Sequence, residues 1–200
     1  MSIPAEDEVL AEGVLEAVEH HQAGKAIQKA ERISRQHPGT RALVPLFTAL
    51  QRLGDGSGAR WKDAERASVE KAVGEAIRVA RPSADQLERL AELSRDPSPV
   101  VRRYAAWKLG DLGDRSTTAL VERLQDPDDT VRIWTVDALG STSSRDQGRV
   151  RPLMDALAAL DGALEAATAE AAGTGMAAFE AGQAGRQIGE AMNVIRSVTP

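Results

Sequence analysis

Apolar residues recur along most of this chain at the three- and four-residue spacing of an amphipathic helix. In the first part of the chain they form three stripes, at Val9, Leu10, Val14, Leu15 and Val18, at Ile27, Ala30 and Ile33, and at Leu43, Leu46, Phe47, Leu50 and Leu53. Residues 37–39 break the pattern before the third stripe, which ends at Gly54. A longer charged helix is expected from Trp61 to Ala80, before Pro82 interrupts it. The pattern predicts an all-α chain.

An internal repeat follows these helices. The segment Asp96 to Gly110 aligns without a gap on the segment Asp126 to Gly140, 30 residues later. A third, more divergent copy lies 33 residues further on and has no Asp-Pro start; its matching positions are Leu153, Leu157, Leu164, Ala171 and Gly173. Each repeat has room for two helices of about 11 residues with tight turns. The repetition predicts an α-solenoid of antiparallel helix pairs.

These repeats resemble the short HEAT repeats first associated with phycobilisome chromophore lyases, whose pattern is DPDPxVRxxAAxALGxLGD. The resemblance covers residues 83–173, and it implies a HEAT-like superhelix of the armadillo type that acts as a scaffold. We therefore expect four parts: an N-terminal helical region at 1–54 that caps or extends the solenoid, a linker at 55–60 that contains Gly56 and Gly58, a HEAT-like repeat region at 61–173, and a C-terminal Gly- and Ala-rich segment at 174–200.

Two pairs of polar residues occupy equivalent positions in the two clear repeats. Asp96 and Asp126 are expected to cap the second helix of each repeat, with the following proline in its first turn. Arg102 and Arg132 come six residues later. If repeats stack, the guanidinium of one repeat approaches the carboxylate of the next, so these four residues form a predicted structural ladder.

The second helices also contain the residues expected to bind a partner. Helical spacing places one set toward the interior, namely Val101, Tyr104, Ala105, Lys108 and Leu109 with their equivalents Val131, Trp134, Thr135, Ala138 and Leu139. Trp107 is expected to point away from that interior, beside Arg103. With Ile133 and Asp137 on the next repeat, these residues form a candidate partner-binding patch on the concave side. The alternative is that Trp107 packs on a neighbouring helix.

The C-terminal segment contains a short amphipathic stripe. Ile188, Met192 and Ile195 follow the spacing of one helix face. The stripe docks either on the chain's own solenoid or in the groove of a partner.

Charge and composition narrow the class of partner. The chain has 25 basic and 30 acidic residues, a net charge of −5, which is unlike the basic surface that nucleic-acid binding requires. It has no cysteine, no basic and apolar leader at its start, and no apolar run of the roughly 18 to 20 residues that cross a bilayer. We expect a cytoplasmic protein that binds another protein, with no membrane contact.

No catalytic or metal-binding motif emerges from the sequence. His20 and His21 are adjacent and so point to different sides of a helix, and the sequence has no His-Glu pair of the kind that iron-binding HEAT-like hydroxylases use. We expect no cofactor, no metal and no enzymatic activity. Two alternatives stay open: a HEAT-like DNA-binding or DNA-glycosylase-type protein, suggested by Trp107 four residues before Asp111, and a lyase-like chaperone for a modified or chromophore-bearing partner.

Overall fold

The computed structural model describes residues 6–36, 39–54 and 61–141. Within these ranges the chain is helical and contains no strand, which confirms the predicted all-α class. The α-helices are α1 (Glu6–Glu19), α2 (Ala23–Gln36), α3 (Leu43–Gly54), α4 (Asp63–Val79), α5 (Leu87–Leu93), α6 (Pro99–Gly110), α7 (Thr117–Arg123) and α8 (Asp129–Ser141), with short 3-10 turns before α3, α5 and α7. No helix of the described part is long and apolar enough to span a membrane.

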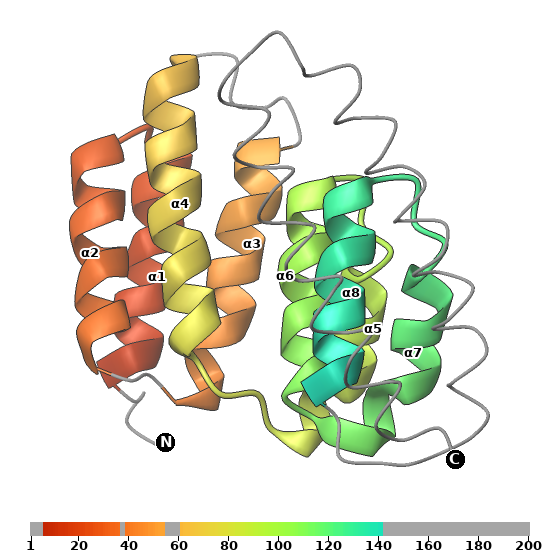
Figure 1. The fold of residues 1–200 in the computed structure, drawn as a ribbon. Helices are drawn as coiled ribbons and strands as arrows, with labels where there is room; N and C mark the ends of the chain where they lie inside the picture. The colour runs from red at the N-terminus through yellow and green to blue at the C-terminus, as the bar shows by residue number, and fades with distance from the viewer. Residues whose placement is uncertain (1–5, 37–38, 55–60, 142–200) are drawn as a thin grey trace, which may run out of the picture. The chain divides into compact units, whose positions relative to one another are not determined.

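The chain divides into two compact units, residues 1–104 and 105–200, and the division falls within α6. In the first unit, α1 packs against α2 and α3, while α4 packs against the same two helices from the other side. Each of these helices therefore has two close neighbours in the set. In Figure 1, α1 and α3 run in one direction and α2 and α4 in the other. The four helices thus form two antiparallel pairs, in which α1 lies beside α3 and α2 lies beside α4.

Two ion pairs show the register of α1 on α3. Glu8 Oε2 lies 3.5 Å from Arg41 Nη1, just before α3, and Glu19 Oε1 lies 3.8 Å from Arg52 Nε near its end. Both pairs join residues 33 positions apart, from 8 to 41 and from 19 to 52. A constant offset at both ends means that the two helices are parallel and level. The first helices of the two N-terminal pairs, α1 and α3, are therefore offset by 33 residues, the same number that separates the second and third copies of the sequence repeat.

The core of the first unit consists of the residues that the helical stripes predict. The buried apolar side chains of its first four helices include Ala11, Val14, Val18, Ala26, Ala30, Ile33, Leu43, Leu46, Phe47, Leu50, Val69, Val73, Ala76 and Ile77. Many of them are small, which allows helix axes to approach closely. His21, in the turn between α1 and α2, has a positive φ of 56°, which is uncommon for a residue other than glycine.

Side-chain amides join α5 and the start of α6 to the earlier helices of the same unit. Gln86 Nε2 donates a hydrogen bond to the Thr40 carbonyl at 2.9 Å, and its Oε1 accepts one from the Ser83 N–H at 3.1 Å. Gln51 Nε2, on α3, donates to Asp96 Oδ2 at 2.6 Å. These contacts connect the start of the clear sequence repeats to the N-terminal helix pairs.

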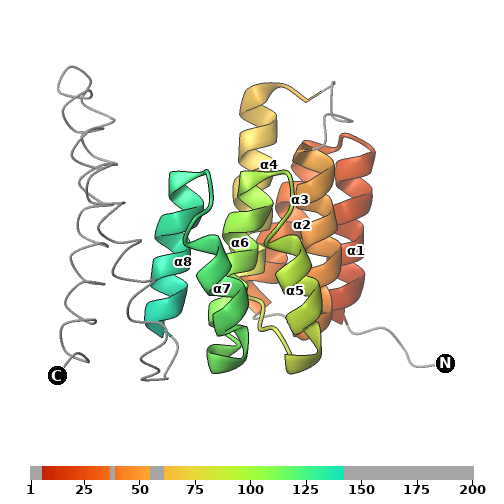
Figure 2. The same ribbon diagram turned by 90° about the vertical axis from the view of Figure 1, so that its right-hand side faces the viewer.

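The second unit contains the end of α6 together with α7 and α8. Helices α7 and α8 lie side by side and are joined by a tight turn (Figure 2). Gly110 approaches α8 so closely that a Cβ atom at this position would lie 2.9 Å from the Ala138 Cβ. Gly113 follows with a φ of 65°, a left-handed conformation that glycine adopts without strain.

Several predicted features lie outside the described residues. These are the linker at 55–60, the third sequence repeat after residue 141, and the C-terminal segment with Ile188, Met192 and Ile195. The proposed domain limits, including the placement of 1–54 relative to the repeat region, stay predictions.

Candidate partner-binding site

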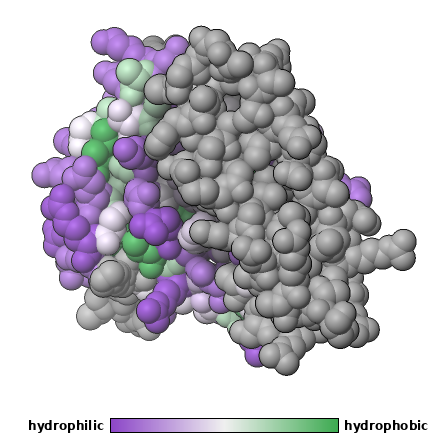
Figure 3. Space-filling view, viewed as in Figure 1, coloured by the Kyte–Doolittle hydropathy of each residue, from purple (hydrophilic) through white to green (hydrophobic). Residues whose placement is uncertain are grey.

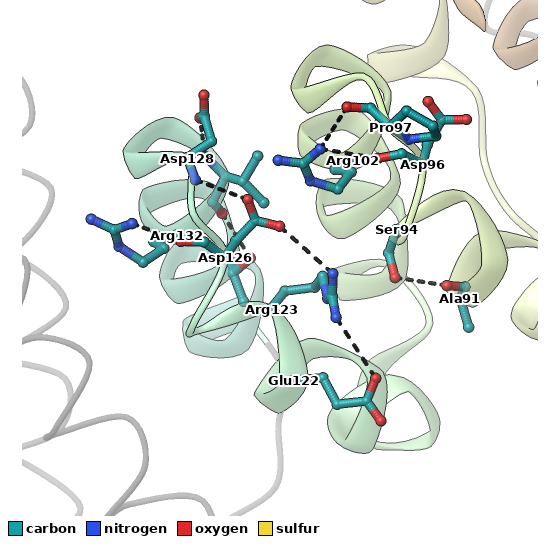
Figure 4. Close-up of polar contacts among 12 residues, drawn as sticks. Ala91, Ser94, Asp96, Pro97, Arg102, Glu122, Arg123, Asp126, Asp128 and Arg132 are labelled. Atoms are coloured by element: carbon teal, nitrogen blue, oxygen red, sulfur yellow. Dashed lines mark hydrogen bonds and ion pairs between the residues drawn. The ribbon is translucent and has the colours of Figure 1, made fainter.

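The Asp-Pro turns that open α6 and α8 are built alike. Asp96 Oδ1 accepts a hydrogen bond from the Ser98 N–H at 2.9 Å, and Asp126 Oδ1 accepts one from the Asp128 N–H at 3.0 Å (Figure 4). Each carboxylate therefore closes the turn that leads into the second helix of its pair. Asp126 is 3 % exposed, and Arg123 Nη1 lies 3.6 Å from its Oδ2, which compensates part of the cost of burying its charge.

The cap itself differs from the sequence prediction. Helix α8 begins at Asp129, so the preceding residue, Asp128, occupies the N-cap position, and its Oδ1 accepts a hydrogen bond from the Val131 N–H at 3.1 Å. Asp126, which we expected to cap this helix, lies two residues further back. The proline at 127 likewise precedes the helix and is not part of its first turn. The predicted N-cap position was therefore two residues too early, because an Asx-type turn separates Asp126 from the start of the helix.

Arg102 and Arg132 reach back to the main chain of their own turns. Arg102 Nη1 donates to the carbonyls of Asp96 and Pro97, both at 3.0 Å, and Arg132 Nη1 donates to the Asp126 carbonyl at 2.6 Å (Figure 4). The matched spacing of six residues thus has a local structural role within each repeat. The predicted ladder from one repeat to the next stays a prediction.

In the first unit, Tyr104 on α6 packs against Gly74 on α4. A Cβ atom at Gly74 would lie 2.0 Å from the tyrosine Oη and 2.3 Å from its Cζ, so the ring occupies the space that a larger residue would need. Tyr104 is buried, as predicted, and its burial raises the pKa of the phenol, while the nearby Arg103 opposes that rise. The Arg103 guanidinium carbon lies 5.1 Å from the centroid of the same ring, within the range of a cation–π contact.

In the second unit, Trp107 on α6 packs against Trp134 on α8. The two ring centroids are 5.0 Å apart and their planes are inclined by 58°, a tilted arrangement that aromatic pairs favour. Both side chains are half-buried, so each is less extreme than the sequence indicated: Trp107 is not fully exposed and Trp134 is not fully interior. The result combines both readings of Trp107, which packs on a neighbouring helix and still presents part of its surface.

The other members of the patch are placed as follows. Arg103 and Ile133 are half-buried, and Asp137 is exposed. Arg103 belongs to the first unit, while Trp107, Ile133 and Asp137 belong to the second. Within the second unit, the tryptophan pair is therefore the aromatic part of the candidate patch, and Asp137 is its exposed acidic residue.

The burial of Lys108 was predicted from the sequence, but its ion pair was not. Helical spacing correctly placed it inside, and it is 1 % exposed. Its Nζ donates to Asp111 Oδ2 at 2.6 Å, one turn later. Asp111, which suggested a DNA-glycosylase-type alternative through its distance from Trp107, is thus the ion-pair partner of a buried lysine.

The described residues contain no group of three or more His, Asp or Glu side chains that could hold a metal ion.

One aromatic contact in the first unit was not predicted from the sequence. The ring of His21, at the turn after α1, stacks on Trp61 with centroids 5.4 Å apart. No regular spacing links two residues 40 positions apart, so no sequence pattern announces this pair.

Comparison with known proteins supports the class that these features define. The family model for HEAT repeats matches residues 87–173, from the start of α5 to beyond α8. This match supports a HEAT-repeat protein. HEAT repeats generally mediate contacts between proteins. No curated protein matches the chain.

Proposed function

We propose that this chain is a non-enzymatic scaffold or adaptor that binds a partner protein through an α-solenoid of antiparallel HEAT-like helix pairs. The observation that carries the proposal is the match of residues 87–173 to HEAT repeats. The parallel register of α1 on α3 supports extension of the same architecture to the N-terminal helices. The Asp-Pro, Arg and Gly positions of residues 96–110 and 126–140 support the short, phycobilisome-lyase-like repeat type.

We place the partner on the part of the second unit that contains Trp107, Ile133 and Asp137. The sequence also assigns Arg103, near the end of the first unit, to this patch. A tryptophan with part of its ring accessible is typical of the residues that dominate binding energy in protein interfaces. Packing against Trp134 holds the Trp107 ring in one orientation before binding, which lowers the entropic cost of association. We expect the protein to act in the cytoplasm.

The test starts with affinity purification of the full chain from native lysate and identification of the captured protein. Its affinity is then measured by calorimetry with the purified partner. Asp137→Lys reverses an exposed charge and should weaken binding about fivefold to tenfold, whereas Glu88→Lys, which reverses another exposed charge on α5, should leave the affinity unchanged. Trp107→Ala should weaken it further, by about 2 kcal/mol or more, with helicity checked by circular dichroism.

Equal affinity of all these variants would rule out this surface. Capture of nucleic acid in place of a protein, persisting at physiological salt, would contradict the scaffold itself and favour the DNA-binding alternative. Capture of a protein only when it bears a covalently attached chromophore would favour the lyase-like chaperone.

A further inference from the structure

The second helices of the first two pairs, α2 and α4, have a groove between them. Its volume is about 490 Å³, and it is lined by Ile27, Glu31, Ser34 and Arg35 on α2 and by Ser68, Lys71, Ala72 and Glu75 on α4. All eight residues belong to the first unit. The tryptophan pair belongs to the second unit and contributes no residue to the groove.

The groove has an apolar floor and polar walls. Ile27 and Ala72 are half-buried, while the four charged lining residues are exposed. The space-filling view shows apolar residues among strongly hydrophilic ones on the face formed by α2 and α4 (Figure 3). Small side chains, Ser34 and Ser68, leave the walls low enough for another surface to reach the floor.

The charges of the groove form an alternating square. Helices α2 and α4 run in the same direction, and on each of them two charged residues lie four positions, or about one turn, apart. The lining of the groove runs from Ile27 to Arg35 on α2 and from Ser68 to Glu75 on α4. Glu31 therefore lies at about the height of Lys71, and Arg35 at about the height of Glu75. Along α2 the order is negative then positive, and along α4 it is positive then negative.

An alternating square of this kind is complementary to itself. In a two-fold dimer the same patch meets its own copy. With the two-fold axis along the groove, Glu31 of one copy faces Lys71 of the other, and Arg35 faces Glu75. With the axis across the groove, Glu31 faces Arg35 and Lys71 faces Glu75. Every facing pair is attractive in both orientations, whereas a patch of one sign would repel its copy.

The ion pairs present within each helix do not oppose such a contact. Arg35 Nη2 lies 3.2 Å from Glu31 Oε2, and Arg78 Nε lies 3.0 Å from Glu75 Oε2, with the side chains about half exposed or more. Exposed pairs of this type contribute little to stability. The carboxylates can therefore share or exchange partners when a second charged surface approaches.

We propose that the α2–α4 groove is a homodimer interface, occupied by the same groove of a second copy of this chain. The second copy is the occupant whose charges are known, and those charges fit. This inference goes beyond the scaffold function, because it provides two copies of the partner-binding surface in one assembly.

Sedimentation equilibrium of the full chain tests the interface. We expect a concentration-dependent monomer–dimer equilibrium that weakens as salt is raised. Lys71→Glu should weaken dimerisation about tenfold or more, because one substitution alters two symmetry-related contacts. Glu12→Lys, an exposed charge reversal on α1 outside the groove, is the matched control and should leave the equilibrium unchanged. Circular dichroism establishes that each variant is folded.

A fourfold variant completes the test: Glu31→Lys, Arg35→Glu, Lys71→Glu and Glu75→Lys together invert every sign of the square and preserve its self-complementarity. It should dimerise nearly as well as the natural chain. A monomeric natural chain at all concentrations up to about 1 mM, which corresponds to a contact weaker than about −4 kcal/mol, would overturn the proposal. So would a dimer that Lys71→Glu leaves intact, or a fourfold variant no better than the single one.

Discussion

The contact between Tyr104 and Gly74 predicts that an alanine at position 74 destabilises a helix that it would ordinarily stabilise. In a helix interior, replacing glycine by alanine is favourable by about 0.5–1 kcal/mol. Gly74 lies within α4 and is buried. Its missing Cβ would lie 2.0 Å from the Tyr104 Oη, far closer than van der Waals contact allows. The buried ring must therefore move.

The net magnitude follows from these two opposing effects. Forcing an extra methyl group into a packed site costs about 1–3 kcal/mol, which exceeds the gain in helix propensity. We expect Gly74→Ala to lower the free energy of unfolding by about 1–2 kcal/mol. For a chain of this size, such a change shifts the Tm by about 2–8 °C. Urea unfolding followed by far-ultraviolet circular dichroism measures it.

A double-mutant cycle isolates the cause. Tyr104→Leu removes the Oη and Cζ atoms that the new methyl group would meet. In that background Gly74→Ala should stabilise the chain by about 0.5–1 kcal/mol, as in an ordinary helix. Gly24→Ala on α2, where a Cβ would meet nothing within 4 Å, is the control in the natural background. If Gly74→Ala stabilised the natural chain as much as the Tyr104→Leu variant, the packing of Tyr104 against α4 would be refuted.

Three further predictions concern the second helices. Gly110→Ala should lower the free energy of unfolding by about 1–3 kcal/mol in thermal melts, because its Cβ would lie 2.9 Å from that of Ala138 on α8; an unchanged Tm would contradict this close approach. Asp128→Ala should cost about 1 kcal/mol through loss of the bond to the Val131 N–H, and Asp128→Ser should recover most of it. Burial raises the pKa of Tyr104 above its ordinary value of 10.0. The stability due to its neutral form is therefore present below pH 10 and is lost as the pH rises through the folded-state pKa. In urea unfolding, the free energy of unfolding should fall less between pH 8 and pH 11 for Tyr104→Phe than for the natural chain.

The helices and their interior faces follow from the sequence because burial of apolar surface dominates the energy of such a fold. The stripe through Leu43, Leu46 and Phe47 lies in the core as its spacing indicates. Even Lys108, a charged residue, is buried where helical spacing places it. Periodicity determines which side of a helix faces inward, whatever the chemistry of one residue on that side.

The candidate site was less predictable, since it depends on where one helix meets another. The partial burial of Trp107 results from Trp134, which lies on the next second helix and not at the repeat-equivalent position. A rule based on one helix assigns each residue to an inner or an outer face, and a half-buried pair between two helices satisfies neither assignment. The prediction of the α8 cap was wrong for a related reason. A two-residue shift of the helix start moves the N-cap position from Asp126 to Asp128 without changing the apolar periodicity that follows.

Positions 104 and 134 are equivalent in the repeat, and in each unit the aromatic residue there contacts an earlier second helix. In the first unit the tyrosine fits the space left by Gly74, so the contact is closed and its ring is buried. In the second unit Trp134 packs against the indole of Trp107, and both rings are half-buried. The aromatic residue at this repeat position is therefore buried against a glycine in the first unit and half-buried against a tryptophan in the second. Under the proposed function we therefore expect substitutions of Trp107 or Trp134 to change partner binding, and substitutions of Gly74 or Tyr104 to change stability.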